Sequence, residues 1–588
     1  MKATRLFDYL LQQKNLKPTA DFLSYKDVRD SKWKSYTYQE TYERVLKAAQ
    51  LLLDAGIQPN DKVALIAANC PEWNFADLAI QMIGGVCVPM YPTISQHDYE
   101  YIFKDAEIKI AFVSNETIYK KIEAVRIQLP LLQKIISFDV IKNTEHFTTA
   151  LSNINTNEQQ INSLSENVNE QDLATVIYTS GTTGNPKGVM LTHYNIISNL
   201  NSIQQDLPLL EGKKALSFLP LCHSFERTVF YAYLANGIHI CYAENLEKIA
   251  DNLKEIQPYC FTTVPRLLEK VFDKIIDKSQ QLDAVKKKLF DWALQIGMEY
   301  EYGKEKKDIL YALQLFVARK LVFSKWKEAL GGNIEFIVTG AAPIQPRLIK
   351  IFTAAGIDVL EGYGLTETSP VLAFNRMNVE DRKIGTVGMP VRGVVIKIAD
   401  DGEILAKGPN IMKGYYHQQA LTDEVIDKEG WFHTGDIGEL TDNKFLKITD
   451  RKKELFKTSG GKYIAPQAIE NKMKESKYIE QIMVVGEYQK YISALIVPCF
   501  SYLHEFAKVH SISFTSNKEL IEDKAVIQLI ESEIKKLNTN FGQWEQIKKF
   551  TLLPAEWTSE SGELTPTMKV KRKIISERYR KQIEEMYT

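Results

Sequence analysis

The sequence contains few cysteines, and it has almost no net charge. The six cysteines of the 588 residues lie far apart with no C-x-x-C pair. This spacing argues against a disulfide framework or a zinc site and favours a reducing compartment. The formal net charge of −1 provides no overall field that would attract nucleic acid or an acidic membrane. We therefore expect a cytoplasmic protein that does not bind nucleic acid.

A long uninterrupted apolar run is also missing. The longest uncharged stretch, residues 78–97, is nearly long enough to span a bilayer, but two glycines and two prolines interrupt it. We expect a helix that runs into a buried strand there. The N-terminus "MKATRLFDYLLQQKN" has no apolar core before a small-residue cleavage site, so we expect no signal peptide. With 45% apolar and 25% charged residues, the chain has a globular composition and is long enough for at least two domains.

Short apolar runs alternate with helical patterns in the first quarter of the chain. Residues 62–90 have the pattern of strand, loop, helix and strand, and residues 109–114 and 134–139 are further β-branched runs. This alternation predicts a parallel sheet with helices on its faces. Residues 151–171 are polar and rich in asparagine, which predicts an excursion on the surface.

The pattern changes after about residue 265. Residues 267–278 predict an amphipathic helix, and more helix is expected up to about residue 330. Lysines in that segment admit a membrane-surface interpretation, but acids interspersed among them favour a solvated helix face. After about residue 380, Asp-Gly and Gly turns between short runs predict an antiparallel β subdomain. Residues 482–498 predict a hairpin in a separate α+β unit.

The segment "YTSGTTGNPKGVMLTH" (178–193) combines glycines, hydroxyls and a lysine between two apolar runs. Glycines let backbone N–H groups converge on an anion, and hydroxyls add further donors. The segment does not match a Walker P-loop, G-x-x-x-x-G-K-[ST]. Pro186 stands where the second glycine is required, and Gly188 follows Lys187. We therefore predict a phosphate-binding loop of another kind.

A second polar cluster, "GYGLTET" (362–368), also follows a predicted strand, at the edge where open α/β sheets bind ligands. Tyr363, exposed between glycines, can stack on a base. Glu367 beside a phosphate loop can hold Mg²⁺. An ordinary turn is the alternative interpretation of this segment.

Two more clusters follow. In "WFHTGDIG" (431–438), Asp436 can accept two hydrogen bonds from a ribose diol, or it can simply cap a turn. The segment "DRKKELFKTSGGKYIAP" (450–466) is basic and then rich in glycine, and its Arg451 can alternatively pair with a surface acid. Each cluster is weak evidence for a nucleotide site by itself, but their order along the chain is informative.

Five segments in this order resemble the AMP-forming acyl-adenylate superfamily of acyl-CoA synthetases, luciferases and nonribosomal adenylation domains. They are residues 178–193, 362–368, 402–416, 430–438 and 450–466. Within the superfamily, the chain most resembles the long-chain fatty acyl-CoA synthetases. That resemblance comes from "FLPLCHSFERT" (218–228), "VPRLLEKVFDKI" (264–275), the following helical segment and "ELTPTMKVKR" (563–572).

The resemblance covers essentially the whole chain and implies its organisation. Residues 1–449 are expected to form a large N-terminal domain of parallel α/β sheets, with a small β subdomain at about 380–449. Residues 450–588 are expected to form a small, mobile α+β C-terminal domain that carries the catalytic lysine.

The resemblance also implies a two-step reaction. A fatty acid first attacks the α-phosphate of ATP to give acyl-AMP and pyrophosphate, and CoA then displaces AMP to form the thioester. The expected cofactor is Mg²⁺, held by Glu367 and Thr182, with ATP and CoA as co-substrates. The residues expected at the β- and γ-phosphates are Thr179, Ser180, Gly181, Thr182, Thr183, Gly184 and Lys187.

The nucleoside and the acyl group have their own implied residues. Tyr363 is expected to stack on adenine, within a set that comprises Gly340, Ala341, Ala342, Gly362, Gly364 and Thr366. Asp436 and Arg451 are expected to hold the ribose. His223 is expected to act as a gate near the acyl carboxylate, with a buried, backbone-bonded histidine as the alternative. Its neighbour Cys222 suggests a nucleophile, but the family forms no acyl-enzyme there.

The catalytic lysine is expected to be Lys569. Thr567 and Met568 precede it where the wider superfamily has Ser-Gly, as in the long-chain branch. Lys571 and Lys573 lie close by in the sequence, so the assignment depends on this alignment.

The family uses one site for both steps by rotating its small domain. Asp450 is at the hinge position, and Ser459, Gly460 and Gly461 are expected to approach the pantetheine of CoA.

Several alternatives stay open from the sequence alone. An adenylate-forming ligase could act on another carboxylic acid or on a carrier-protein thiol, and an inactive acyl-nucleotide sensor or scaffold would be a different class of protein. The aromatic segment 228–242 can line an acyl tunnel or belong to the ordinary core. The preferred acyl chain length stays open. A monomer and a homodimer both remain open, as does a peripheral contact at the inner face of the membrane.

Overall fold

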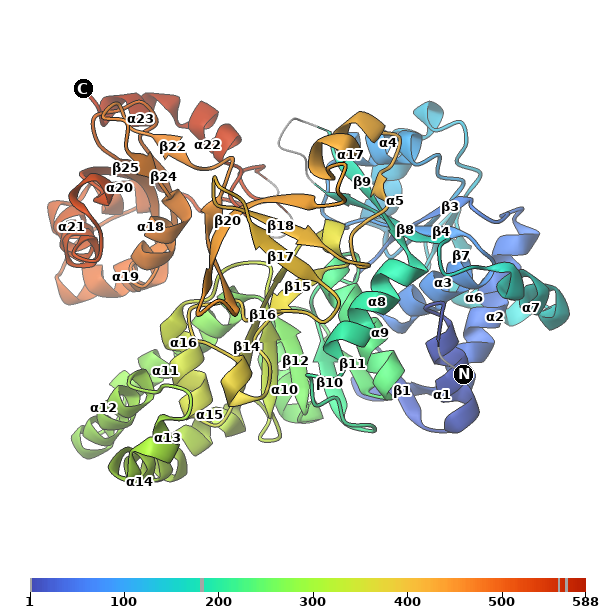
Figure 1. Cartoon of the computed structure of the whole chain (residues 1–588), viewed down its shortest axis with the longest axis horizontal. Helices are drawn as coiled ribbons and strands as arrows, with labels where there is room; N and C mark the ends of the chain where they lie inside the picture. Colours follow the sequence, from blue (N-terminus) through green and yellow to red (C-terminus); the bar gives the residue numbers. More distant parts are fainter. Residues whose placement is uncertain (1–2, 180–184, 559–560, 566–568) are drawn as a thin grey trace. The chain divides into compact units, whose positions relative to one another are not determined.

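The computed structural model describes residues 3–179, 185–558, 561–565 and 569–588 (Figure 1). The chain divides into two compact units. Unit 1 consists of Met1–Lys397, Leu405–His433 and Asp442–Leu446. Unit 2 consists of Ile398–Ile404, Thr434–Thr441 and Lys447–Thr588. Each unit has its own sheets and its own apolar core.

The first sheet of unit 1 has eight strands, of which the central ones are parallel. In order across the sheet they are β19 (Gly414–Tyr415), β9 (Lys187–Thr192), β8 (Leu173–Thr179), β4 (Val86–Pro89), β3 (Lys62–Ile66), β5 (Ile110–Val113), β6 (Lys134–Ser137) and β7 (Glu145–His146). Val63 and Leu65 pack into one core cluster, whereas Ala64 and Ile66 pack into another. Both faces of β3 are therefore buried, which explains its continuous apolar run.

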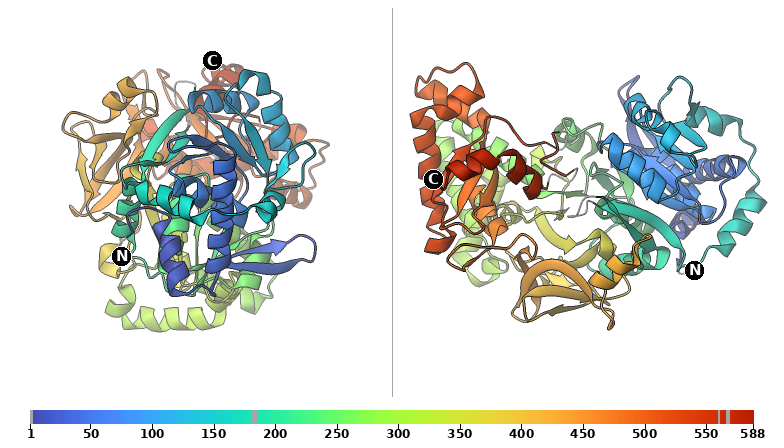
Figure 2. Two further views of the ribbon diagram at one scale, coloured as in Figure 1. Left: turned by 90° about the vertical axis from the view of Figure 1, so that its right-hand side faces the viewer. Right: turned by 90° about the horizontal axis from the view of Figure 1, so that it is seen from above.

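Helices cover both faces of this sheet (Figure 2). α2 (Tyr38–Asp54) and α3 (Pro71–Met82) contribute to the first cluster, and α4 (Gln96–Asp105) and α5 (Glu116–Glu123) contribute to the second. The predicted parallel sheet with helices on its faces is confirmed.

The second sheet of unit 1 has nine strands. In order they are β16 (Met389–Pro390), β15 (Val371–Phe374), β14 (Asp358–Gly364), β13 (Phe336–Thr339), β12 (Cys260–Thr263), β10 (Lys214–Ser217), β11 (His239–Tyr242), β1 (Asp21–Asp27) and β2 (Lys32–Thr37). β12, β13 and β14 are parallel neighbours, and the register aligns Thr263 with Thr339 and Thr339 with Glu361. The segments that follow these strands therefore begin side by side at one edge of the sheet.

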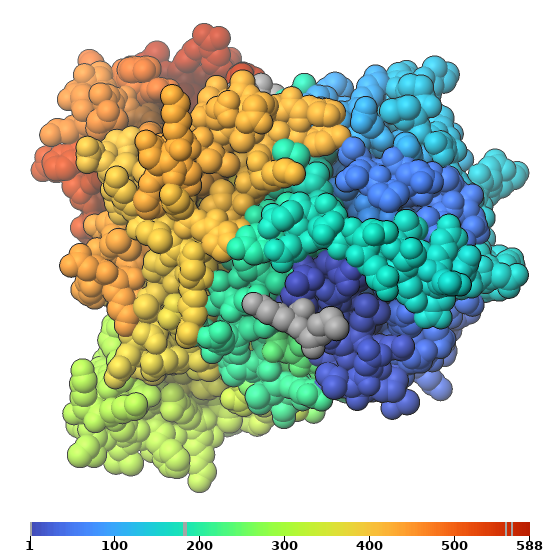
Figure 3. Space-filling view, turned by 45° about the vertical axis from the view of Figure 1, so that its right-hand side comes forward, coloured from blue at the N-terminus to red at the C-terminus, as the bar shows by residue number. Residues whose placement is uncertain are grey.

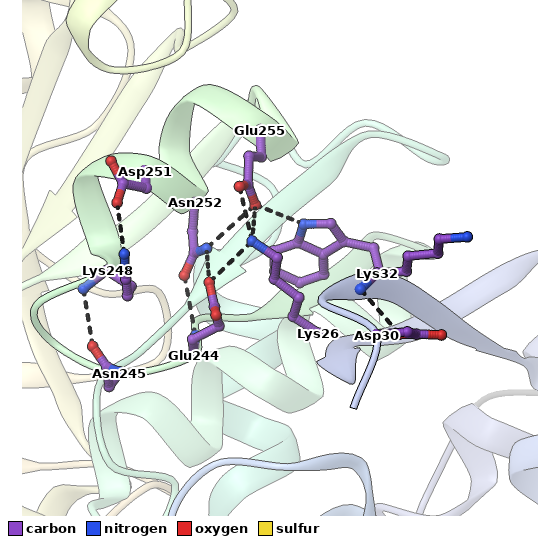
Figure 4. Close-up of polar contacts among 10 residues, drawn as sticks. Lys26, Asp30, Lys32, Glu244, Asn245, Lys248, Asp251, Asn252 and Glu255 are labelled. Atoms are coloured by element: carbon purple, nitrogen blue, oxygen red, sulfur yellow. Dashed lines mark hydrogen bonds and ion pairs between the residues drawn. The ribbon is translucent and has the colours of Figure 1, made fainter. Parts of the chain in front are cut away.

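A polar network joins the N-terminal hairpin β1–β2 to α10 (Ile249–Ile256), as Figure 4 shows. Lys26 Nζ lies 2.8 Å from Glu255 Oε1 and 3.3 Å from Glu244 Oε2. Trp33 donates its indole N–H to Glu255 at 2.9 Å. Hydrogen bonds from Lys26 and then Trp33 lower the pKa of Glu255. The network connects parts of the chain that are more than 200 residues apart in the sequence, as between Lys26 and Glu255.

Several helices form a further part of unit 1: α11 (Pro265–Gln280), α12 (Ala284–Met298), α13 (Lys304–Lys307), α14 (Ile309–Ala318), η2 (Arg319–Phe323), α15 (Ser324–Ala329) and α16 (Pro346–Ala354). α11 confirms the amphipathic helix expected at 267–278. Phe272, Phe290, Trp326 and Phe352 pack together in the core of this part. Every helix among the described residues is too short or too polar to cross a bilayer.

Unit 2 is built mainly on a three-stranded sheet of β24 (Ile479–Val485), β25 (Ser493–Pro498) and β26 (Lys549–Leu552). β24 and β25 are antiparallel, which confirms the hairpin predicted at 482–498. A separate four-stranded sheet contains β17 (Val395–Ile398), β18 (Glu403–Lys407), β20 (Phe432–Thr441) and β21 (Phe445–Arg451), and the boundary between the units passes along these strands. The expected mixed α/β fold is confirmed, whereas the domain boundary at 449/450 stays a prediction.

Candidate active site

Two strands bring together the ends of the predicted phosphate loop. Thr179 is the last residue of β8 and Lys187 is the first residue of β9, and the two are register partners in an antiparallel pair. The predicted ligands between them, Ser180, Gly181, Thr182, Thr183 and Gly184, lie outside the described residues. The described structure therefore accounts for the base of the loop.

Glu367 lies in the short helix η3 (Thr366–Thr368), beside Tyr415. The Tyr415 hydroxyl donates a hydrogen bond to Glu367 Oε1 at 2.9 Å, and the Met412 N–H donates to the Glu367 carbonyl oxygen at 2.8 Å. Lys187 Nζ is 5.3 Å from the centroid of the Tyr415 ring. A cation, a phenol and a carboxylate are thus adjacent, and a carboxylate oxygen is a ligand that Mg²⁺ prefers.

Tyr415 is a residue that the sequence reasoning missed. Burial, with a further contribution from the charge of Glu367, raises the pKa of Tyr415 well above its ordinary value. The phenol therefore stays neutral and can donate to the carboxylate. The available signal was the segment 402–416, which matches a family motif but did not indicate a role for this side chain.

The predicted adenine segments meet at the edge of the second sheet. Gly340, Ala341 and Ala342 follow β13, and Gly362, Tyr363 and Gly364 end β14. A Cβ atom at Gly340 would lie 3.2 Å from the Gly362 carbonyl oxygen, and one at Gly364 would lie 1.7 Å from the Pro370 carbonyl oxygen. Gly364 therefore cannot carry a side chain, and Gly340 allows a close approach of the two strand ends. Tyr363 is half-buried beside them.

His223 precedes α9 (Ser224–Asn236) and caps it. Its Nδ1 accepts the Phe225 N–H at 3.1 Å. Ser224 Oγ lies 3.3 Å from Thr366 Oγ1, so the start of α9 is adjacent to the segment that carries Glu367. Burial raises the pKa of the Cys222 thiol well above its ordinary value, which argues against a role as nucleophile.

Glu226, the first residue of α9 with an ionisable side chain, is buried. Its carboxyl group accepts hydrogen bonds from Ser217 Oγ at 2.5 Å and from Thr262 Oγ1 at 2.6 Å. Burial raises the pKa of Glu226 to about 7, and the two hydroxyls oppose this shift. The hydroxyls come from β10 and β12, so Glu226 attaches the start of α9 to the second sheet.

Arg227 connects the same helix to the first sheet. Its Nη1 donates to Thr175 Oγ1 of β8 at 2.6 Å, and its Nη2 pairs with Asp77 of α3. Tyr231 also donates to Asp77. Only 1% of Arg227 and none of Asp77 is exposed. β8 ends at the phosphate loop, so this buried network holds α9 against the strand that leads into it. Sequence reasoning did not identify Glu226 or Arg227 individually.

The aromatic segment 228–242 lies mainly in the interior. Phe230, Tyr231, Tyr233, Leu234 and Tyr242 are all members of the main core cluster of unit 1. The structure therefore favours the core interpretation for these side chains over that of a tunnel lining.

In unit 2, the two residues expected to hold the ribose lie beside each other. Arg451 Nε lies 3.4 Å from Asp436 Oδ1, and the Asp436 N–H donates to Thr434 Oγ1 at 3.1 Å. Asp436 is buried, whereas Arg451 is partly exposed. The pair is compatible with binding a diol and also with the surface pairing that the sequence left open.

Asp450, the predicted hinge residue, is fully buried. Its carboxylate accepts the Arg451 N–H at 2.6 Å and the Gln467 N–H at 3.2 Å. Burial raises the pKa of Asp450 to about 6 even though these N–H groups oppose the shift. The side chain thus connects the end of β21 to the start of α18 (Pro466–Met473).

Lys569 is an exposed residue of a narrow hairpin in unit 2. Its N–H donates to Thr565 Oγ1 at 3.0 Å, the Thr565 N–H donates to the Lys569 carbonyl oxygen at 2.8 Å, and Leu564 pairs with Val570. Thr567 and Met568, which precede the lysine, lie outside the described residues.

Ion pairs fix the chain beyond this hairpin. Arg572 lies 2.6 Å from Glu470 and 3.1 Å from Glu454, and Arg578 pairs with Glu563. These contacts hold both arms of the hairpin to the body of unit 2.

The predicted CoA-side residues Ser459, Gly460 and Gly461 belong to a different hairpin, between β22 (Phe456–Lys457) and β23 (Tyr463–Ile464). Gly461 has φ +76°, which favours glycine, and its N–H donates to the Thr458 carbonyl oxygen at 2.9 Å.

Comparison with known proteins decides which family the chain represents. A family model described as AMP-binding enzyme matches residues 12–416, and one described as AMP-binding enzyme C-terminal domain matches residues 454–588. The chain belongs to the AMP-binding enzyme family. Long-chain-fatty-acid–CoA ligase FadD15 of Mycobacterium bovis is 33% identical over 96% of this chain and 94% of its own length. Long-chain-fatty-acid–CoA ligase 1 of Homo sapiens is 32% identical over 96% of this chain and 84% of its own length.

A solved structure shows that this AMP-binding enzyme shares the fold of adenylate-forming proteins. The adenylation domain of a carboxylate reductase from Mycobacterium chelonae superposes with a TM-score of 0.75 at 21% identity, covering 99% of this chain and 91% of that one. The two family models and the long-chain-fatty-acid–CoA ligases together confirm the family resemblance seen in the sequence. The roles of individual site residues remain predictions.

Proposed function

We propose that this AMP-binding enzyme is a long-chain-fatty-acid–CoA ligase. It activates a fatty acid with ATP to give acyl-AMP and pyrophosphate, and it then transfers the acyl group to CoA with release of AMP. One observation carries the proposal: long-chain-fatty-acid–CoA ligases match 96% of the chain at 32–33% identity. This match favours a fatty acid and CoA over another carboxylic acid or a carrier-protein thiol.

The chemistry explains what the site must supply. A fatty carboxylate resists attack by a thiolate because it is negatively charged and has no good leaving group. Adenylation gives it AMP as a leaving group. This first step brings an anion to a polyanion, so the enzyme must provide positive charge and oriented hydrogen-bond donors.

Unit 1 supplies several of these groups in the proposal. Thr179 and Lys187, with the loop between them, bind the β- and γ-phosphates. Glu367, together with Thr182, binds Mg²⁺, which neutralises phosphate charge when it is present. The hydrogen bond from Tyr415 orients the Glu367 carboxylate. Because the Tyr415 hydroxyl is neutral, Glu367 keeps its negative charge, and Mg²⁺ prefers such oxygen ligands.

The nucleoside and acyl groups use neighbouring residues of unit 1. Tyr363 stacks on adenine beside Gly340, Ala341 and Ala342. His223, at the start of α9, acts as the gate near the acyl carboxylate. The 3.3 Å contact between Ser224 and Thr366 supports this assignment, because it connects the histidine segment to the Glu367 segment.

Unit 2 supplies the residues that hold the ribose and the groups that differ between the two steps. Asp436 and Arg451 hold the ribose, and Lys569 provides charge to the carboxylate and α-phosphate during adenylation. Rotation at Asp450 then exchanges Lys569 for Ser459, Gly460 and Gly461, where small residues admit the pantetheine of CoA.

The hinge assignment has its own test. Proline at position 450 fixes φ near −65° and removes the backbone N–H, which restricts rotation there. Asp450→Pro should keep ATP–pyrophosphate exchange and lose acyl-CoA formation. Asp450→Ala, which retains a flexible backbone, is the matched control. Full acyl-CoA turnover by the proline variant would contradict the hinge role.

We also propose that the enzyme works in the cytoplasm, as a monomer or a homodimer, and that it contacts a membrane peripherally. Long-chain acids partition into bilayers because each buried methylene is worth about 0.8 kcal/mol. Access to a bilayer surface would therefore bring the enzyme to its substrate.

The function is tested with a panel of acids from C6 to C20, supplied with ATP, Mg²⁺ and CoA. We expect AMP and pyrophosphate to form in equal amounts, together with acyl-CoA, and the yield to be highest with long-chain acids. Exchange without CoA consumption would indicate another acceptor. Absence of any ATP–pyrophosphate exchange would indicate an inactive sensor or scaffold.

A further inference from the structure

A stripe of apolar side chains on the helical part of unit 1 faces outward. α14, η2 and α15 form one continuous helical segment from residue 309 to residue 329. Five large apolar residues of α14 and η2 are more than half exposed. They are Ile309 (87%), Leu310 (67%), Leu313 (61%), Phe316 (62%) and Leu321 (52%), called here the α14 face. Ile309, Leu313 and Phe316 follow one another at intervals of four and three residues, which places them along one side of the helix. Leu310 lies three residues before Leu313, and Leu321 lies five residues beyond Phe316, in η2.

The opposite side of the same helix is anchored in the core, so the orientation of the α14 face is fixed. Tyr311, Leu315 and Ala318 are buried members of the core cluster around α12. The Tyr311 hydroxyl donates to the Ile296 carbonyl oxygen of α12 at 3.0 Å. The helix cannot turn its exposed side chains inward without removing these contacts from the core.

The position of the segment within unit 1 leaves this side open. Figure 1 and the left view of Figure 2 show α12 and α14 at the outer edge of the unit, away from both of its large sheets. Figure 3 shows the same part of the chain (light green) at the edge of another view. Large apolar side chains that are exposed together in this way mark an interaction site.

Basic residues flank the α14 face at both ends. Lys306 and Lys307 precede it, Lys320 lies within it, and Lys325 follows it, and all four are exposed. Between residues 304 and 325 there are six basic residues and two acidic ones. The interspersed acids that favoured a solvated face for the wider helical segment are absent between residues 309 and 324. The chain as a whole has a net charge of −1, so this local excess of positive charge is a property of the segment.

We propose that the α14 face is a membrane-docking surface that inserts its apolar side chains into a bilayer containing anionic lipids. The inference rests on the peripheral membrane contact proposed above and names the surface that makes it. Interfacial helices combine an apolar stripe with basic residues in this way, and they enter the headgroup boundary by about 5–10 Å. Anionic headgroups attract the flanking lysines, and the apolar side chains leave water.

Charge favours a bilayer over a second copy of the chain as the occupant. A two-fold dimer through this surface would place the same patch of six basic and two acidic residues against itself. Like charges would then face each other across the interface, which is unfavourable. An anionic lipid surface neutralises the same residues. A dimer through the α14 face is therefore the outcome that opposes the proposal.

The experiment uses the full chain and two kinds of vesicle, one of phosphatidylcholine and one of phosphatidylcholine with phosphatidylglycerol. We expect the protein to sediment with the anionic vesicles and much less with the neutral ones, and high salt should weaken the binding. Leu313→Gln with Phe316→Gln should reduce partitioning about tenfold, since it removes two anchors. Lys306→Glu with Lys307→Glu should reduce binding to the anionic vesicles by at least about tenfold.

A matched control is available elsewhere in unit 1. Ile127 and Val140 are 95% and 83% exposed, so Ile127→Gln with Val140→Gln removes the same kind of side chain from a different surface. This control should bind vesicles like the unaltered protein. Circular dichroism and thermal unfolding verify that all variants fold, which we expect because every altered residue is exposed.

The outcomes separate this inference from the proposed ligase activity. Turnover of palmitate delivered on albumin, without vesicles, should be the same for the docking variants and the unaltered protein. Absence of turnover by all of these proteins would contradict the proposed ligase activity. The vesicle experiment would still test the docking surface by itself. Equal vesicle binding by the Leu313/Phe316 variant and the control would overturn the docking surface. A dimer that this variant abolishes, without vesicle binding, would overturn it in favour of a second copy.

Discussion

The start of α9 in unit 1 and the Lys569 hairpin in unit 2 use charge in opposite ways. At the start of α9, Glu226 and Arg227 are buried, and partners from α3, β8, β10 and β12 contact them. In the hairpin, Lys569 is exposed, and ion pairs of Arg572 and Arg578 hold the chain beside it. The first region keeps its charges in the interior, and the second presents one at the surface.

This difference separates two roles for a charged side chain. A buried charge that is paired with an opposite charge, as Arg227 is with Asp77, fixes how elements pack, and its removal lowers the stability. An exposed charge adds little stability, and the loss of one that acts on the reacting groups is expressed in the rate. Substitutions in the two regions should therefore separate stability from activity.

The largest effect is expected from breaking the buried pair in unit 1. Arg227→Met leaves Asp77 buried without its cation, which should lower the free energy of unfolding by about 3–5 kcal/mol. Chemical denaturation monitored by circular dichroism measures the change. Lys120→Met is the control, because its pair with Glu116 is exposed on both sides and should contribute less than about 1 kcal/mol. Equal effects of the two substitutions would remove the contrast between buried and exposed charge.

Lys569→Ala should produce the converse result. We expect adenylation to slow by roughly 10²–10³-fold, since a group that stabilises developing charge is lost, while thermal stability stays nearly unchanged. Pyrophosphate exchange measures adenylation, and thioester formation from supplied acyl-AMP should be largely retained. Lys573→Ala is the neighbouring control and should retain exchange. Equal damage to both half-reactions would show that Lys569 has been given the wrong role.

Glu226 makes the stability of the first region depend on pH. Its pKa in the folded protein is about 7, above the ordinary value of 4.5. Below pH 4.5 the carboxyl group is neutral in both states and carries no penalty. Stability should fall as the pH rises from 4.5 to 7, because the unfolded chain releases this proton first, and the loss of about 3 kcal/mol should then stay constant.

The variant Glu226→Gln isolates this contribution, because it keeps the shape and cannot ionise. The free energy of unfolding of the variant, relative to that of the unaltered protein, should increase as the pH rises from 4.5 to 7.5. Unfolding curves collected at several pH values measure the difference. A constant difference between the two proteins across this range would contradict the raised pKa.

The smallest effect is expected at Tyr415. Tyr415→Phe removes the hydrogen bond to Glu367, which is worth about 1 kcal/mol. We expect KM for MgATP to rise about fivefold with a smaller change in kcat. Tyr194→Phe is the control, because that side chain is exposed on α8 (His193–Ile203). A change of the same size in the control would assign the effect to general perturbation.

The sequence allowed the parallel sheets to be predicted because their strands are buried on both faces. Runs such as β3 and β5 are therefore apolar throughout, and their spacing leaves room for helices. It did not allow α7 (Glu158–Asn167) to be predicted as a helix, since only Ile161 and Ser165 are buried in a segment that is otherwise polar. Asn157 caps this helix by accepting the Gln160 N–H at 3.1 Å.

The candidate site was predictable where a local motif carries it. Glu367, Asp436 and Lys569 lie in such motifs. The partners that position these groups come from distant parts of the chain and carry no local pattern. Arg227 pairs with Asp77, 150 residues earlier, and Tyr415 binds Glu367 from 48 residues later. Such pairings depend on which strands are neighbours, and spacing along the sequence does not encode that.

The central claim is that the fatty carboxylate attacks the α-phosphate of ATP. Palmitate labelled with ¹⁸O in its carboxylate tests this most directly, with ATP, Mg²⁺ and CoA present and the nucleotide products analysed by mass spectrometry. Because CoA displaces AMP by attack at the carbonyl carbon, one labelled oxygen should remain on the AMP phosphate. Formation of ADP and orthophosphate, or of AMP without label, would contradict the account.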